Sequence, residues 1–390
     1  MWSFESTDEQ QIFKETVRKY FEREVAPLVE EAEETEVFPV DLFKKMGRDN
    51  YLCIRYPVEY GGLGVDKITE CIFREELSRV SQGFATAWSA HSHLGTYPIY
   101  KYGTEEQKEK YLFPAIRGEK IAAFGLTEPN AGSDVKSMKT TATKKGDHYV
   151  IRGSKIFITN ATIADYVIVA AYTNPAIGYK GISLFIVETN SEGFHIARKL
   201  KKEGIRSSET AELFFDDCIV PAENLIGLTE ENFSGVMSTL SEGRIGVAAN
   251  CVGMAQAAME NASQYAKERI QFGEPIANYQ AINHKIADMY TEIQAARLLV
   301  YQAAWMLDKG LKCDKEASMA KLFASEVAVK AAREAIQILG GYGMMREYPV
   351  GRILRDALVY TVGEGTSEIQ KNIIAKQIGL VSKTKIKQNS

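Results

Sequence analysis

The residue with the clearest chemical potential is Glu364, in the segment Gly363-Glu364-Gly365-Thr366-Ser367. The flanking glycines leave its carboxylate free of crowding by neighbouring side chains. Ser367 and Gln370 have the spacing of a capping box, which predicts a helix starting just after the bend. A carboxylate held this way could act as a general base. A structural role near the helix N-terminus is the stronger interpretation when the segment is taken alone.

Two segments in the middle of the chain could hold a large polar ligand. Residues 124–134 run from a predicted strand into a loop with small residues, two hydroxyl groups and free backbone N–H groups. Residues 155–160 form a predicted strand that places Phe157 and Thr159 on one face, where a ring and a hydroxyl could flank a planar ligand. An ordinary turn and ordinary core packing explain these two patterns as well.

Two helix ends further along the chain suggest phosphate or nucleotide contacts. Arg269 follows a long predicted helix and could form a bidentate pair with a pyrophosphate, or could complement its own helix C-terminus. The paired glycines Gly340 and Gly341 could let backbone approach an adenosine or diphosphate group, or could simply end the helix.

The elements that must position these residues change type twice. Helical periodicity dominates the first part, beginning with a capping box at Thr7 and Gln10, and short β-prone runs separated by turns follow from Ile121. Long helical stretches return in the last part and suggest a four-helix bundle. We therefore predict a mostly α fold with a middle antiparallel β domain. Its predicted limits are an N-terminal helical domain at 1–120, a β domain at 121–228 and a C-terminal helical domain at 229–390.

Composition excludes several function classes. The 390 residues carry a net charge of −4, which gives no general attraction to nucleic acid. The five cysteines are scattered and show no metal-ligand spacing, so we expect reduced thiols and no metal site. We find no secretory signal pattern and no run of about 20 apolar residues, so we expect a cytoplasmic protein without a membrane span.

Taken together and in order, these segments resemble the acyl-CoA dehydrogenase family along nearly the whole chain. No single motif carries the resemblance. It rests on four segments in this order: Leu126-Thr127-Glu128-Pro129-Asn130-Ala131-Gly132-Ser133-Asp134, Arg269-x-Gln271-Phe272-Gly273, Gln337-x-x-Gly340-Gly341 and Glu364-Gly365-Thr366-Ser367.

The resemblance implies a homotetramer with one FAD per subunit between the β domain, which would be barrel-like, and the C-terminal bundle. The residues expected to contact FAD within the same chain are Phe124, Leu126, Thr127, Ser133, Phe157, Thr159, Thr366 and Glu368. Those expected to reach the FAD of a neighbouring subunit are Arg269, Phe272, Gln337 and Gly341. Those expected to contact the substrate are Ser133, Arg244 and Gly365.

The reaction implied is the dehydrogenation of an acyl-CoA thioester to the trans-2-enoyl-CoA, as in the degradation of fatty or other carboxylic acids. Glu364 matches the base that removes the α-proton while the β-hydrogen leaves as hydride to flavin N5. The backbone N–H of Glu364 and a ribityl hydroxyl of the flavin would polarise the thioester oxygen. An electron-transfer flavoprotein is the expected electron acceptor.

A second possible position for the base is also resolved by the resemblance. Isovaleryl-type members carry the base immediately before the arginine that Arg244 matches, and Gly243 occupies that position here. Glu242 lies one residue earlier, about 100° around the helix. We therefore assign the base to Glu364.

The acyl group is less constrained. Straight-chain members often have an aromatic residue before the base, and Gly363 stands there, which favours a short, branched or cyclic acyl group. Glutaryl-type members hold a distal carboxylate with an arginine where this chain has Ala85, so we expect no dicarboxylic substrate. His91 and His93 lie on a segment expected to border the acyl pocket and are candidates for shaping specificity.

Two alternatives remain open from the sequence. One is an acyl-CoA oxidase-like enzyme or another flavoenzyme that passes electrons to O₂. Chain length argues mildly against it, because such oxidases usually have an additional C-terminal domain. The other is a non-catalytic flavoprotein of the same fold, and the presence of Glu364, Arg244 and the flavin-lining set argues against it.

Overall fold

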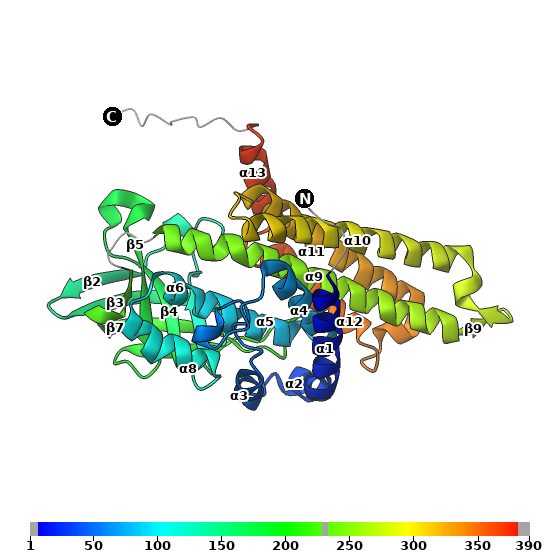
Figure 1. Cartoon of the computed structure of the whole chain (residues 1–390), viewed down its shortest axis with the longest axis horizontal. Helices are drawn as coiled ribbons and strands as arrows, with labels where there is room; N and C mark the ends of the chain where they lie inside the picture. The colour runs from blue at the N-terminus through cyan, green and yellow to red at the C-terminus, as the bar shows by residue number, and fades with distance from the viewer. Residues whose placement is uncertain (1–6, 228–232, 381–390) are drawn as a thin grey trace.

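The computed structural model describes residues 7–227 and 233–380, with the side chains of 233–238 left out of the description. A sheet lies at one end of the molecule and a bundle of long helices extends to the other (Figure 1). The domain boundary predicted between residues 228 and 229 lies outside the described residues, and the predicted domain limits stay predictions.

The first third of the chain is helical, as predicted. Helix α1 begins with the expected capping box, because the Thr7 hydroxyl accepts from the backbone N–H of Gln10 and the Gln10 side chain accepts from the backbone N–H of Thr7. The helices are α1 Asp8–Glu24, α2 Val29–Thr35, α3 Asp41–Arg48, α4 Lys67–Val80, α5 Gln82–Ser89, α6 Tyr97–Tyr102, α7 Glu105–Gln107 and α8 Phe113–Ile116, with π-helical turns at Ala90–Gly95 and Lys108–Leu112.

The middle of the chain forms one eight-stranded sheet in the order β6-β7-β3-β2-β4-β5-β8, with β1 paired to β4. Most pairs are antiparallel, but β1 and β2 both pair with β4 in parallel, which corrects the prediction of an antiparallel sheet. The strands are β1 Ala122–Gly125, β2 Thr141–Lys145, β3 His148–Thr159, β4 Tyr166–Tyr172, β5 Ile182–Glu188, β6 Phe194–Lys199, β7 Thr210–Pro221 and β8 Leu225–Ile226.

The last part of the chain returns to helices, as predicted. The longest, α9 Phe233–Glu268, runs from the sheet to the far end of the molecule, where a short hairpin of β9 Ile270–Gln271 and β10 Glu274–Pro275 follows it (Figure 1). The other helices are α10 Gln280–Asp308, α11 Asp314–Leu339, α12 Val350–Val362 and α13 Ser367–Gln377. Alanine lines the contacts of α9 with α11, and small side chains let helices approach closely.

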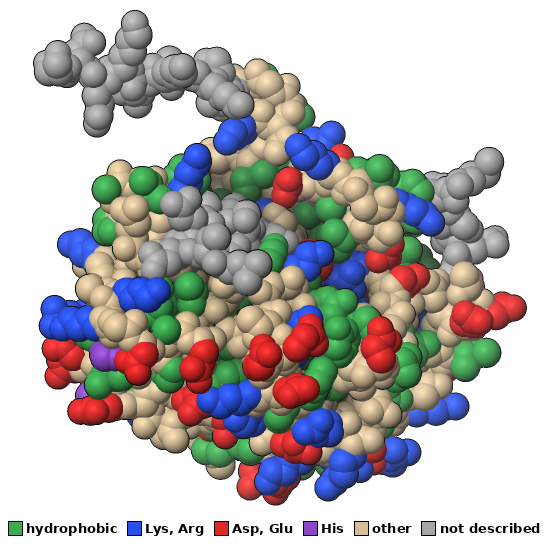
Figure 2. Space-filling view, turned by 60° about the vertical axis from the view of Figure 1, so that its left-hand side comes forward, with side chains coloured by type: hydrophobic (Ala, Val, Ile, Leu, Met, Phe, Trp, Pro, Cys, Tyr) green, Lys and Arg blue, Asp and Glu red, His purple; other side chains and the backbone are tan. Residues whose placement is uncertain are grey.

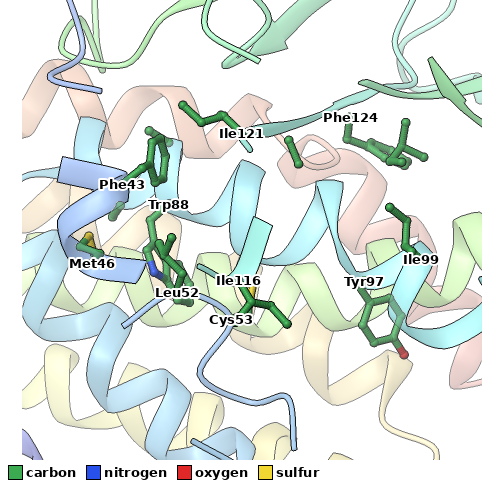
Figure 3. Close-up of a cluster of buried hydrophobic side chains, with 14 of the residues drawn as sticks. Phe43, Met46, Leu52, Cys53, Trp88, Tyr97, Ile99, Ile116, Ile121 and Phe124 are labelled. Atoms are coloured by element: carbon green, nitrogen blue, oxygen red, sulfur yellow. The ribbon is translucent and has the colours of Figure 1, made fainter. Parts of the chain in front are cut away.

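A hydrophobic core joins the N-terminal helices to the sheet. Phe43 of α3 and Trp88 of α5 belong to the same buried cluster as Phe124 of β1 (Figure 3). Because this cluster packs β1 against the helices, the loop that leaves β1 is held at a fixed place between the two parts. Separate clusters fill the C-terminal bundle and the opposite side of the sheet.

On the face drawn in Figure 2, Lys and Arg side chains are interspersed with Asp and Glu, and neither sign of charge forms a large patch. None of the helices in the described part of the chain is both long enough and apolar enough to cross a bilayer. Within the same residues no cluster of His, Cys, Asp and Glu has the arrangement of a metal site.

Candidate active site

Glu364 lies in a tight bend between α12 and α13. Its φ of +52° and that of Gly365, +95°, place two consecutive residues in the left-handed region, which is costly for a residue other than glycine. Lys321 holds the bend by donating to the carbonyl oxygen of Gly365 at 2.7 Å. Gln370 donates to the carbonyl oxygens of Glu364 and Gly365 at 3.3 and 3.0 Å. The surrounding helices therefore determine where the carboxylate points.

The cap of α13 differs from the predicted one. Thr366 is the N-cap, and its hydroxyl accepts from the backbone N–H of Ile369 at 3.3 Å. Ser367 instead donates to Glu326 of α11 at 2.7 Å. The predicted capping box of Ser367 and Gln370 is therefore wrong. The Ser367 side chain binds the neighbouring helix α11, and the Gln370 side chain binds the backbone of the bend.

The carboxylate of Glu364 packs against a glycine of α9. A Cβ atom at Gly243 would lie 2.8 Å from Oε2 of Glu364 and 3.8 Å from Nε2 of His93. Oε2 is buried and has no hydrogen-bond partner among the described residues. Burial raises the pKa of Glu364, against the opposing effects of Arg74, Lys321 and Arg244. A buried carboxylate with a raised pKa and a free oxygen atom is suited to accepting a proton.

Two cations on the bundle helices lie close to this carboxylate. Arg244 is 7% exposed, donates to Ser241 at 3.3 Å, and its Nε atom has no partner among the described residues. Lys321 is fully buried, and burial lowers its pKa while Cys251 and Glu364 raise it. Glu242 points elsewhere, because its carboxylate binds Arg55 at 2.7 Å and the Tyr97 hydroxyl at 2.5 Å.

The two histidines of the π-helical turn have different surroundings. His91 accepts from the backbone N–H of Ala122 at 3.0 Å through Nδ1, and its Nε2 lies 3.0 Å from the carbonyl oxygen of Ala115. Both of its ring nitrogens are therefore used, one to join the turn to β1 and the other to join it to α8. Nε2 of His93 lies 3.1 Å from the carbonyl oxygen of Thr239, on the side of the ring near Gly243. Only His93 is therefore close to the carboxylate of Glu364.

The predicted loop and strand of the β domain meet at one end of the sheet. The backbone N–H of Ile156 donates to the carbonyl oxygen of Thr127 at 2.9 Å. Lys155, which is fully buried, donates to the carbonyl oxygen of Leu126 at 3.0 Å and to Glu128 at 2.8 Å. These bonds bring Phe124, Leu126 and Thr127 beside Phe157 and Thr159. Ser133 lies further along the same loop and is exposed.

Phe157 stands at an irregularity of β3. The register against β7 shifts between Lys155 and Ile158, and Phe157 has a φ of +62°. Such bulges turn a side chain out of the regular alternation and are frequent next to active sites. The ring of Phe157 is 64% exposed, an unusual state for an aromatic side chain of a strand.

Helix α5 connects this end of the sheet to the bend. Asn160, directly after β3, donates to the carbonyl oxygen of Ala87 at 2.9 Å. The neighbouring Thr86 lies 2.7 Å from the hydroxyl oxygen of Tyr360, four residues before Glu364. Three features fit a planar ligand with hydrogen-bonding groups, held between the sheet and the bundle. They are the exposed ring of Phe157, the open space around Gly132, and Oε2 of Glu364, which is buried without a partner among the described residues.

The remaining predicted residues lie elsewhere in the chain. Arg269 and Gly341 line one pocket of about 570 Å³ at the far end of the bundle, where the Arg269 guanidinium lies 5.8 Å from the centre of the Tyr342 ring. Phe272 is 96% exposed at the tip of the hairpin, and Gln337 is exposed on α11. Thr366 and Glu368 follow the bend directly. One chain therefore carries two separate groups of predicted site residues.

The buried pair of Lys155 and Glu128 gives a testable consequence. Burial lowers the pKa of Lys155 to about 8, and Glu128 opposes this effect. Replacing Lys155 with Met would leave a carboxylate 7% exposed with only the backbone N–H groups of Lys139 and Thr140 as partners. We expect a loss of about 3–5 kcal/mol in unfolding free energy, together with weaker cofactor retention.

Chemical denaturation and a titration of the apoprotein with cofactor measure the two effects. The double variant Lys155→Met/Glu128→Gln is the control, because it removes both charges. Equal stability of the single variant and the wild type would contradict this account of the loop.

Three family models match the chain one after another. They are described as acyl-CoA dehydrogenase N-terminal domain, middle domain and C-terminal domain, and they match residues 7–119, 123–218 and 233–379.

Several known proteins are similar over almost their full length. The acyl-CoA dehydrogenase of Bacillus subtilis strain 168 is 49% identical over 95% of this chain and 98% of its own. The short-chain-specific acyl-CoA dehydrogenase of Clostridium acetobutylicum is 46% identical over 96% and 99%. CarC of Acetobacterium woodii, a subunit of a caffeyl-CoA reductase-Etf complex, is 42% identical over 95% and 98%. The solved structure of butyryl-CoA dehydrogenase from Megasphaera elsdenii has a TM-score of 0.93 and 42% identity, covering 97% of this chain and all of that one.

Proposed function

The chain belongs to the acyl-CoA dehydrogenase family, and on that premise we propose that Glu364 is the base that takes the α-proton from a short, branched or cyclic acyl-CoA. As a member of this family it is an FAD-dependent oxidoreductase that acts on the CH–CH bond of acyl-CoA thioesters. The observation that carries the proposed role of Glu364 is its buried Oε2, which packs on Gly243 without a hydrogen-bond partner among the described residues.

In this proposal the residues of the chain bind and orient FAD and the substrate, and the charged side chains hold charge near the base. FAD, when bound, accepts the hydride that leaves the β-carbon. We assign its contacts within the chain to Phe124, Leu126, Thr127, Ser133, Phe157, Thr159, Thr366 and Glu368. The exposed ring of Phe157 supports this assignment, because a planar group stacked on it would bury apolar surface.

Substrate binding involves a second set of groups. We propose that the backbone N–H of Glu364 donates to the thioester oxygen. We assign the other contacts with the CoA thioester to Ser133, Arg244 and Gly365. The positive φ of Glu364 supports this role, because it holds the backbone of the base in one fixed orientation. Gly363 adds no side chain next to the base, which favours branched or cyclic acyl groups.

We propose that a homotetramer completes the cofactor site. Arg269, Phe272, Gln337 and Gly341 lie at the opposite end of the bundle from the sheet, so they are placed to serve a second copy of the chain. The 96% exposure of Phe272 supports this, since a phenyl ring of that exposure gains much from burial in an interface. Analytical ultracentrifugation of the holoprotein tests it, with a tetramer expected.

An electron-transfer flavoprotein is the proposed electron partner, and the cytoplasm the proposed location. The similarity to CarC supports the partner, because that relative is named as part of a complex with Etf. If the enzyme were oxidase-like, its reduced flavin would be reoxidised quickly by O₂. Slow reaction with O₂ and fast reoxidation by an added electron-transfer flavoprotein are expected in stopped-flow mixing.

The proposed function is tested by mixing the holoenzyme anaerobically with butyryl-, isovaleryl-, cyclohexanecarbonyl- and octanoyl-CoA. We expect the flavin absorbance to bleach with at least one short, branched or cyclic acyl-CoA, and to bleach more slowly with octanoyl-CoA. An absence of bleaching with all four would contradict the dehydrogenase proposal and would favour the non-catalytic alternative.

Lys321 gives a prediction about pH. Its cation lowers the pKa of Glu364, and its bond to Gly365 holds the bend. Replacing Lys321 with Met should raise the pKa of Glu364, so the acidic limb of the pH profile for flavin reduction should move to higher pH. Loss of the bond should also lower the rate on the plateau about 10- to 100-fold through misplacement of the base.

Lys321→Arg is the matched control, since it keeps the charge and should keep the position of the acidic limb. An acidic limb that stays in place or moves to lower pH in Lys321→Met would show that Lys321 does not act on the base.

A further inference from the structure

Residues 200–209, the β6–β7 loop, connect two strands of the sheet and are held by two buried carboxylates from different helices. Asp356 of α12 is 2% exposed and accepts from the backbone N–H of Ile205 at 2.5 Å. Glu33 of α2 is 9% exposed and accepts from the backbone N–H of Ser207 at 3.0 Å. The loop therefore ties both helices to the sheet through its backbone.

The contact between the β6–β7 loop and α12 is close as well as hydrogen-bonded. A Cβ atom at Gly204 would lie 2.2 Å from the carbonyl oxygen of Arg355, so only glycine fits between the two backbones. The Arg355 side chain donates through Nε to the carbonyl oxygen of Glu203 at 3.1 Å. Residues 203–205 of the loop thus contact residues 355–356 of α12. These contacts leave the helix little freedom to slide along the loop.

The β6–β7 loop has a backbone conformation that its sequence does not favour. Ile205 has a φ of +49°, in the left-handed region that β-branched residues avoid. The hydroxyl oxygens of Ser207 and Ser208 are buried and have no hydrogen-bond partner among the described residues. A strained backbone persists only where the surrounding structure determines it, and such strain clusters at functional sites. The contacts with α2 and α12 therefore determine the shape of this part of the loop.

The loop and α12 lead to the two halves of the proposed active site. The loop continues into β7, where Thr210 pairs with Thr159 of β3. Helix α12 leads into the bend, where Glu364 follows Asp356 by eight residues, about two helical turns. Because a helix of this length is rigid, a shift of α12 at Asp356 is transmitted to the base. The distance between the base and the end of β3 thus depends on the loop.

Asp356 faces charged groups from three elements. They are Glu33 of α2, Lys202 of the loop, and Arg352 and Arg355 of its own helix. Burial, followed by Glu33, raises the pKa of Asp356 to about 7, while the two arginines oppose this effect. Close to pH 7 a large share of the molecules therefore carries a neutral carboxyl group, which still accepts through its carbonyl oxygen. Asparagine is neutral and has the same shape, so it should preserve the bond to the loop.

We propose that Asp356 is a positioning residue of the reaction: it fixes α12 to the β6–β7 loop and so sets the place of the Glu364 carboxylate relative to the end of the sheet that holds Thr159. The inference rests on the proposed function, since it takes Glu364 as the base. Asp356 contacts neither substrate nor cofactor in this role. Its loss should therefore slow the removal of the α-proton and leave the binding of ligands almost unchanged.

The first test compares Asp356→Ala with Asp356→Asn, both as holoenzymes. Alanine removes the acceptor for the Ile205 N–H, so anaerobic flavin reduction at saturating acyl-CoA should become about 10- to 100-fold slower. The acyl-CoA is the one that reduces the wild type fastest. Binding of its enoyl-CoA product, followed through the flavin spectrum, should change no more than about threefold. Asparagine should keep the rate within about threefold of the wild type. An unchanged rate in Asp356→Ala, or an equal loss in both variants, would overturn the proposal.

Glu33→Ala is the matched control. It removes a bond of the same kind from the same loop, but on α2, which does not lead to the base. Its rate of flavin reduction should stay within about threefold of the wild type. Losses of rate that are equal in Glu33→Ala and Asp356→Ala would indicate a general structural role of the loop, and they would overturn the proposal.

Should Asp356→Ala fail to fold, Gly204→Ala decides in its place. A Cβ 2.2 Å from the carbonyl oxygen of Arg355 has to displace the loop from α12. The rate should again fall while product binding stays the same, and an unchanged rate would overturn the proposal. A wild type that acyl-CoA reduces, together with an unaffected Asp356→Ala, contradicts only this inference. A wild type that no acyl-CoA reduces contradicts the proposed function itself.

Discussion

Replacing Glu364 with Gln is expected to lower the rate of flavin reduction by acyl-CoA roughly 10²- to 10⁴-fold, which is what a positioned general base contributes. Glutamine keeps the shape of the side chain but cannot accept the α-proton. FAD content and binding of the enoyl-CoA product should stay close to those of the wild type, because the bend is held through the carbonyl oxygens of residues 364 and 365. Stopped-flow absorbance at the flavin band measures the rate.

The same variant should not lose stability, which separates the loss of a base from misfolding. Burial raises the pKa of Glu364 in the folded state. The stability that a raised pKa gives is complete below the unfolded-state pKa and is lost as pH rises through the folded-state pKa. At neutral pH the ionised carboxylate therefore costs stability, and the neutral amide removes that cost. A Glu364→Gln protein that reduces flavin at a near-normal rate would refute the assignment.

Adding a side chain at Gly243 is expected to have the second-largest effect. A Cβ there would stand 2.8 Å from Oε2 of Glu364, which is closer than van der Waals contact allows. Because the carboxylate is the end of a flexible side chain, it should move aside at little cost in folding. We expect Gly243→Val to lower kcat about 100-fold, the effect of misplacing a reacting group by about 1 Å.

Gly351→Ala is the control for this substitution, since a Cβ at Gly351 would make only an ordinary contact with the carbonyl oxygen of Gly343 at 3.5 Å. The double variant Gly243→Glu/Glu364→Gly gives a stricter test. It supplies a carboxylate to the same space from α9 and should recover part of the activity that Glu364→Gly alone lacks. A Gly243→Val enzyme with unchanged kcat would show that Oε2 is not the reacting atom.

The order and type of the elements were largely predictable from local periodicity. The buried strands β4 and β5 are short apolar runs bounded by turns, which is the pattern that predicted the β domain. Strands β2 and β6 do not show this pattern, since most of their residues are exposed and lack the alternation that marks a strand. The parallel pairing of β1 with β4 joins segments some 40 residues apart, and no local pattern encodes such a contact.

The site was predictable only in part. Motif order pointed to Glu364, to the loop after β1 and to Phe157, and the structure places the loop and Phe157 together. Lys321 was missed, because it acts through a contact with Gly365, which is 44 residues away in sequence. Gln370 was expected to cap the following helix and instead holds the bend. The only available signal was a charged side chain within an otherwise small or apolar helical face, as for Lys321 between Ala317 and Ala324.

The central claim, that the Glu364 carboxylate takes the α-proton, is tested most directly by proton exchange. The holoenzyme and its Glu364→Gln variant, matched for FAD content, are incubated anaerobically with butyryl-CoA in D₂O, and deuterium at the α-carbon is followed by mass spectrometry. The account predicts that the wild type incorporates deuterium and that the variant does so no faster than buffer. Exchange by the variant at the wild-type rate would contradict it.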